Sequence, residues 1–137
     1  MAFTYRRTIR FADTDAAGVV FFPNHFAICH EAYEESLAAA GIDLQSFTSE
    51  NAVVIPIARS QAEYLRPLRC GEKVAVTLAT AQLGQDSYAI SFEIRRVGPP
   101  EKLAARVRTE HVCISSHSRE RRDLPAGIAA WIRSHSE

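Results

Sequence analysis

The chain has 137 residues, and its 47% hydrophobic and 23% charged residues are typical of a folded domain and exclude a disordered segment. Its 16 Lys and Arg residues balance its 16 Asp and Glu residues, so it lacks the basic excess of a nucleic-acid-binding domain. Three widely spaced cysteines predict no disulfide framework, and no run reaches the roughly 18 apolar residues that a membrane span needs. Without an apolar signal sequence, we expect a single cytoplasmic domain over residues 1–137.

The first third of the chain predicts a strand, a turn and a long helix. Residues 3–11 alternate between apolar and polar side chains, which indicates a strand, and turn-forming residues follow at 13–18. Residues 19–41 read as an entry segment and a helix, in which Pro23 suits the first helical position and Gly41 the end. The apolar stripe of this helix is wide enough to predict that it is largely buried, and it includes Phe26, Cys29, Tyr33, Leu37 and Ala40.

The remainder of the chain predicts mostly antiparallel strands. Apolar runs or alternating patterns occur at 53–57, 60–65, 73–83, 88–95 and 103–115, and a terminal helix is expected at 125–134. One buried helix against one antiparallel sheet is an α+β architecture. Because such a helix covers only one face of the sheet, the other face or an edge needs cover, and we expect a homo-oligomer.

The segment from Phe11 to Asn24 carries the strongest chemical signal. It places Asp13 and Asp15 after a strand, with Gly18 and a helix start soon afterwards. A helix start offers unpaired backbone N–H groups that can hold an oxyanion, and a nearby carboxylate can act as nucleophile or general base. Two other roles for these aspartates are considered, a structural one and calcium binding. Loop aspartates commonly cap helices or close turns. A calcium loop of the EF-hand type is excluded, because the positions of its other ligands carry unsuitable residues.

The run from Asp13 to Asn24 resembles the signature of 4-hydroxybenzoyl-CoA-type hot-dog thioesterases, and the likeness in length and element order covers nearly the whole chain. The resemblance implies a hot-dog fold, in which an antiparallel β-sheet wraps a long central helix. It also implies that Asp15 is the catalytic carboxylate and that the backbone N–H of Phe22 polarises the thioester carbonyl. Gly18 would let the loop backbone approach the substrate, and Asp13 would be structural.

Four further segments, 28–42, 66–67, 70–71 and 111–114, resemble the cyanobacterial type of 1,4-dihydroxy-2-naphthoyl-CoA hydrolase. This resemblance implies release of 1,4-dihydroxy-2-naphthoate in phylloquinone (vitamin K1) biosynthesis, and a homotetramer built as a dimer of dimers. It implies no metal and no cofactor, since CoA is part of the substrate. Two alternatives remain: a thioesterase of the same fold with broader specificity, and a non-catalytic acyl-CoA-binding protein, against which Asp15 argues.

Two groups of polar residues are candidates for substrate binding. His30 and Glu31 lie on the predicted helix, where they could contact an acyl hydroxyl; the alternatives are a structural histidine and a solvated glutamate. Arg119, Arg121 and Arg122 form a basic cluster that could bind the phosphates of CoA, with solvated charge as the alternative. Residues 84–87 lack the basic character of the 4-hydroxybenzoyl enzymes, which leaves the nucleotide contacts open.

Other cysteines and histidines predict packing rather than chemistry. His25 and Cys29 are four residues apart on the predicted helix, but a buried thiol is usually inert. His111, Cys113 and His117 lack a fourth ligand at the usual spacing for a metal site, so we expect them to be structural.

Overall fold

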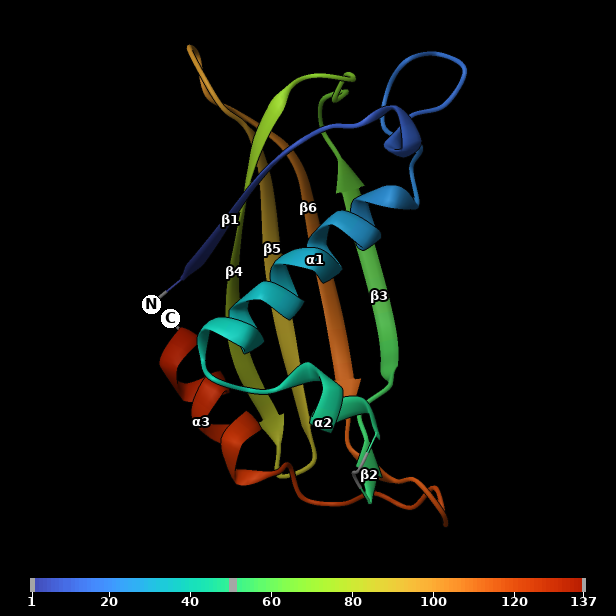
Figure 1. The fold of residues 1–137 in the computed structure, drawn as a ribbon, viewed down its shortest axis with the longest axis vertical. Helices are drawn as coiled ribbons and strands as arrows, with labels where there is room; N and C mark the ends of the chain where they lie inside the picture. The colour runs from blue at the N-terminus through green and yellow to red at the C-terminus, as the bar shows by residue number, and fades with distance from the viewer. Residues whose placement is uncertain (1, 50–51, 137) are drawn as a thin grey trace.

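The computed structural model describes residues 2–49 and 52–136, and over these residues five antiparallel strands form one sheet. The strands lie in the order β1 (Phe3–Thr8), β4 (Lys73–Gly84), β5 (Ser87–Arg96), β6 (Lys102–Val112) and β3 (Ile57–Tyr64). Helix α1 (Asn24–Ala39) runs along one face of this sheet (Figure 1). The remaining elements are α2 (Leu44–Ser49), the short paired strands β2 (Val53–Val54) and β7 (Ile114–Ser115), and α3 (Ala126–His135).

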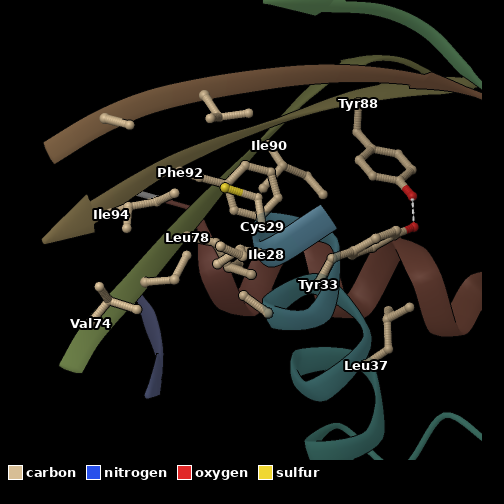
Figure 2. Packing of buried hydrophobic residues seen from close by; sticks show 14 of the residues in the cluster. Ile28, Cys29, Tyr33, Leu37, Val74, Leu78, Tyr88, Ile90, Phe92 and Ile94 are labelled. Atoms are coloured by element: carbon tan, nitrogen blue, oxygen red, sulfur yellow. Dashed lines mark hydrogen bonds between the residues drawn. The ribbon is translucent and has the colours of Figure 1, made fainter. Parts of the chain in front are cut away.

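The core lies between α1 and the sheet (Figure 2). The helix contributes side chains three or four residues apart, which share one helix face, and β4 and β5 contribute alternate residues, which share one sheet face. These two faces pack together as one apolar layer. Burying each large apolar side chain contributes about 1.5–3 kcal/mol. Buried side chains in this layer include Ile28, Cys29, Leu37, Leu78, Ile90, Phe92 and Ile94. The hydroxyl groups of Tyr33 and Tyr88 hydrogen-bond to each other within the layer.

Helix α3 closes the end of the core near the C-terminus of α1 (Figure 1). Its Trp131 is buried and makes ring contacts with Tyr33 and Tyr88 at centroid distances of 5.4 and 5.8 Å. The indole N–H donates to the Ser36 hydroxyl at 3.2 Å, so this large side chain is buried with its polar atom satisfied. Within the described segments, no helix combines the length and the apolar character needed to cross a bilayer.

The α+β class and the long buried helix are confirmed, with differences at several boundaries. The first strand ends at Thr8, because the Asp13 carboxylate accepts the Arg10 N–H at 2.7 Å and folds residues 11–13 into a 3₁₀ turn. Pro23 immediately precedes the first helical residue. The predicted strand 103–115 is interrupted at Cys113, whose N–H turns to the Asp86 carbonyl at 2.7 Å. Helix α2 has no counterpart among the predicted elements.

Candidate active site

A tight loop after the first strand places Asp15 and Phe22 on its two arms. The Asp13 carbonyl accepts the Phe21 N–H at 2.9 Å, and the Val19 carbonyl accepts the Asp15 N–H at 2.9 Å. The turn closes with a third bond from the Gly18 N–H to the Asp15 carbonyl at 3.0 Å. Gly18 has a φ of +79°, a left-handed conformation that favours glycine. The loop therefore fixes Asp15 close in space to the segment that leads into α1.

The Asp15 carboxylate is exposed and only partly engaged. One oxygen, Oδ1, accepts the Ala17 N–H at 2.9 Å, which orients the side chain within the turn. In residues 2–49 and 52–136, no side chain or amide donates to its other oxygen. The carboxylate is therefore oriented by the loop while one oxygen stays available to a reactant.

The start of α1 presents an open amide. The Phe22 carbonyl accepts two hydrogen bonds from His25, one from the backbone N–H at 3.3 Å and one from the ring Nδ1 at 2.8 Å. Since a carbonyl can only accept, Nδ1 carries the proton, and burial lowers the pKa of His25, which keeps the ring neutral. Across the described part of the chain, the Phe22 N–H itself donates no hydrogen bond. It lies at the positive end of the helix dipole, where it can stabilise negative charge.

A cavity of about 240 Å³ adjoins this helix start. Phe22, His25 and Tyr64 line it together, and the Tyr64 ring lies 4.8 Å from His25 and 6.4 Å from Phe22 between centroids. The loop that carries Asp15 contributes Val19 and Val20 to the same cavity, whereas Asp15 itself is not among the lining residues. The Phe22 end of the loop therefore borders a space large enough for part of a ligand.

A second cavity, of about 270 Å³, lies further along α1 between the helix and strands β3, β5 and β6. Its lining residues are Phe26, Ala27, Cys29, His30, Tyr33, Ile57, Ser60, Phe92, Thr109 and His111. His30 is half-exposed at this cavity, and its Nδ1 lies 3.2 Å from the Glu34 carboxylate. Both cavities adjoin the same side of α1, the side toward β3.

Comparison with known proteins identifies the family. The model of the thioesterase-like superfamily matches residues 9–132 of the chain. The chain belongs to the thioesterase-like superfamily.

Several curated relatives of this thioesterase-like chain carry the same name. A 1,4-dihydroxy-2-naphthoyl-CoA hydrolase from Rippkaea orientalis is 45% identical over 95% of this chain and 94% of its own length. A protein of the same name from Nostoc punctiforme is 42% identical, covering 98% and 89% of the two chains. The crystal structure of a 1,4-dihydroxy-2-naphthoyl-CoA thioesterase from Synechocystis superposes with a TM-score of 0.92 at 33% identity, covering 97% and 96%. The predicted family and the hot-dog fold are thereby confirmed.

Glu31 is turned toward β1, about 100° around α1 from His30. Its carboxylate accepts the Tyr5 hydroxyl at 2.9 Å and lies 3.3 Å from Nε of Arg7, both on β1. Arg7 in turn pairs through Nη2 with the Asp13 carboxylate at 2.8 Å. The structure thus gives Glu31 partners on the first strand, and Glu31 lines neither of the two cavities described above. The structural role predicted for Asp13 agrees with this ion pair.

The segment with the arginine cluster lies at the opposite end of the molecule from the loop that carries Asp15 (Figure 1). Arg121 pairs with Asp86 at 3.3 Å, and Arg122 lies 3.8 Å from the Glu120 carboxylate. Arg119 adopts a positive φ of 67° in the same loop. A single copy of the thioesterase-like chain therefore does not bring these arginines next to Asp15, and their contact with CoA phosphates stays a prediction.

Several residues of the site were not assigned to it from the sequence. The side chain of Asn24 donates to the Asp13 carbonyl at 2.9 Å and joins the helix to the loop. His25 was paired with Cys29 in the sequence, yet its ring binds Phe22, while burial raises the pKa of the Cys29 thiol and keeps it inert. Among the described residues, no group of three or more His, Cys, Asp or Glu side chains is placed to hold a metal ion.

Proposed function

We propose that the protein hydrolyses 1,4-dihydroxy-2-naphthoyl-CoA to 1,4-dihydroxy-2-naphthoate and CoA, in the cytoplasm and as a step of phylloquinone biosynthesis. The proposal is supported by relatives of that name at 45% and 42% identity over nearly the full chain. The observation that carries the mechanism is the hydrogen-bonded loop between Asp13 and Phe21. One arm of this loop holds the Asp15 carboxylate, whose second oxygen has no donor among the described residues, and the other arm leads to the Phe22 N–H, which donates no hydrogen bond there.

In this mechanism the loop supplies both parts that thioester hydrolysis requires. The Asp15 carboxylate attacks the thioester carbonyl, or removes a proton from the water that attacks it. The Phe22 N–H and the α1 dipole stabilise the oxyanion as the carbonyl oxygen gains charge. The carbon–sulfur bond then breaks, and CoA leaves as the thiolate and takes up a proton. Where Asp15 has activated water, the acid is released directly and the protonated Asp15 can supply that proton; where Asp15 has attacked, water hydrolyses the resulting mixed anhydride, which releases the acid and restores the carboxylate. These groups carry the reaction without a metal or redox cofactor, and CoA enters as part of the substrate.

The acyl group is proposed to lie beside α1 in the cavity that contains His30, with the nucleotide near the surface. Ligand cavities usually measure about 300–1,000 Å³. The volume of about 270 Å³ therefore suits a bicyclic acyl group rather than a whole acyl-CoA. His30, at the half-exposed rim, is proposed to contact this group.

We further propose that a second copy of the chain packs along β3. This strand forms an edge of the sheet, and exposed apolar side chains lie on it and at the start of α1: Ile57 at 45%, Tyr64 at 47% and Phe22 at 62%. An exposed strand edge and an apolar patch favour pairing with another chain. Two β3 strands paired antiparallel about a two-fold axis place the arginine-bearing end of one copy beside the catalytic loop of the other. Two such dimers would form the expected tetramer.

The experiment is a thioester hydrolysis assay in which the free thiol of the released CoA is measured. We expect 1,4-dihydroxy-2-naphthoyl-CoA to give a kcat/KM at least tenfold above that of hexanoyl-CoA or acetyl-CoA, since even one missing methylene in an apolar pocket changes kcat/KM by about 10–200-fold. A preference for the aliphatic thioesters would contradict the substrate and favour the broader thioesterase. Binding without any hydrolysis would favour the acyl-CoA-binding protein.

A further inference from the structure

His111 is held rigidly in the wall of the second cavity. It lies on β6, is 1% exposed, and stacks on the Tyr88 ring at 4.7 Å with an interplanar angle of 3°. The ring of Tyr33 also contacts it, at a centroid distance of 5.2 Å and an interplanar angle of 59°. The ring nitrogen Nε2 forms a hydrogen bond with the Thr109 hydroxyl at 2.8 Å. These contacts fix the orientation of the imidazole, so the position of its second nitrogen is also fixed.

That second nitrogen, Nδ1, is buried and has no hydrogen-bond partner in residues 2–49 and 52–136. Buried polar atoms almost always have a partner. Leaving one unsatisfied costs about 1–3 kcal/mol. The described chain therefore leaves one nitrogen of a cavity-lining histidine without a partner; because Nδ1 exposes less than 1 Å², a ligand in the cavity reaches it only when a neighbouring side chain moves aside.

We propose that His111 is a specificity-determining residue, whose Nδ1 hydrogen-bonds to a hydroxyl group of the aromatic acyl moiety. The inference rests on the proposed thioester hydrolysis and names the feature of the substrate that the cavity recognises. A hydroxyl suits either tautomer of the ring. If Thr109 donates to Nε2, then Nδ1 carries the proton and donates; if Nε2 donates, then Nδ1 accepts. A carboxylate on the acyl group would suit only the first case.

The charge of the cavity agrees with a neutral partner. Burial, with a smaller contribution from the nearby His30, lowers the pKa of His111 to about 4, so the ring is neutral at pH 7. The Tyr33 hydroxyl is already bonded to Tyr88, and Phe26 and Phe92 add apolar wall. A neutral, largely aromatic space with one unsatisfied nitrogen discriminates by hydrogen bonding and not by charge.

The test compares two thioesters that differ only in their hydroxyl groups, 1,4-dihydroxy-2-naphthoyl-CoA and 2-naphthoyl-CoA. We expect wild type to favour the dihydroxy thioester in kcat/KM and His111→Phe to reduce that preference about tenfold, the worth of one hydrogen bond. His111→Asn, which keeps a polar atom near the position of Nδ1, should retain most of the preference. The matched control is His117→Phe, at an exposed histidine outside both cavities, which should leave the preference unchanged.

Each outcome decides between specificity and packing. Equal losses on both thioesters in His111→Phe and His111→Asn would assign His111 to packing and overturn the inference, as would equal kcat/KM values in wild type. If wild type hydrolysed neither thioester, the proposed function would fail. Calorimetric binding of the two free naphthoates would then decide separately: the inference requires tighter binding of the dihydroxy acid, lost in His111→Phe, and equal binding overturns it. Thermal melting identifies a variant that fails to fold, and His111→Asn then carries the test.

Discussion

The charges of titratable groups on the two sides of α1 are neutralised in different ways. Toward β1, charges neutralise one another: Glu31 and Asp13 both contact the Arg7 guanidinium, at 3.3 and 2.8 Å. Toward β3, the buried titratable groups His25 and His111 are kept neutral by burial and stand at cavities. On the side toward β1, ion pairs and hydrogen bonds join the helix to the strand and the loop. On the side toward β3, the helix borders two cavities that are lined in part by aromatic side chains.

The comparison shows that one helix can hold a loop in place on one side and line cavities on the other. Asp13 accepts from Arg7 with its side chain and from Phe21 and Asn24 with its carbonyl, so the ionic side fixes the loop on which Asp15 and the Phe22 amide depend. Ion pairs of this kind contribute more to defining one geometry than to net stability. The side of α1 toward β3 can therefore contain cavities without weakening the contacts that hold the loop.

The largest expected effect is the loss of turnover when Asp15 is replaced, a change that leaves the contacts on both sides of α1 intact. Asp15→Asn should lower kcat about 10³-fold, because an amide is neither nucleophile nor base. The amide oxygen can still accept the Ala17 N–H, so the melting temperature should not change. The control is Asp43→Asn, since Asp43 makes a similar bond to the Gln45 N–H at 3.1 Å away from the loop. Wild-type turnover in the Asp15 variant would exclude the proposed chemistry.

The second prediction breaks the ionic side. Arg7→Met should lower the free energy of unfolding by about 3 kcal/mol, because it leaves two carboxylates without their shared cation. It should also reduce kcat, since the loop loses its anchor. Arg6→Met, on the exposed face of the same strand, is the control and should change stability by less than about 0.5 kcal/mol. Urea unfolding of both variants measures the difference, and equal losses would refute the anchoring role.

The third prediction titrates the neutral side. The folded pKa of His111, about 4, lies below its unfolded value near 6.5, so the unfolded state takes up a proton first as the pH falls. The stabilisation is complete above pH 6.5 and is lost as the pH falls toward 4. Between pH 7 and 5 the loss should be about 2 kcal/mol in wild type relative to His111→Asn, measured by urea unfolding. Parallel pH profiles for the two proteins would show that His111 titrates normally.

The smallest expected effect compares two glutamates three residues apart on α1. Glu31→Gln should cost about 1 kcal/mol, because it weakens a half-buried contact with Arg7. Glu34→Gln should cost almost nothing, since its pair with His30 is exposed. Thermal melts of the two variants, recorded side by side, measure the difference. A larger loss at Glu34 would reverse the assignment of the anchoring side.

Much of the site could be predicted from the sequence because its parts are local. The strand, the loop and the helix start are contiguous, and the residues that form them, from Asp13 to Asn24, are also the recognisable motif. The roles of Asp15 and Phe22 stay predictions, yet their common loop follows from a short stretch of chain. The buried stripe of α1 could likewise be predicted, because helical spacing reports which residues share a face.

The tertiary structure alone decided what faces each side of that helix. Strand order places β1 at one edge of the sheet and β3 at the other, and helical periodicity carries no information about that order. Only the assembled sheet brings Arg7 to Glu31, and Thr109 and His111 to the cavity beside His30. Local spacing therefore determined the elements and the motif, while the long-range pairing of strands determined which polar groups are anchored and which are left facing the cavities.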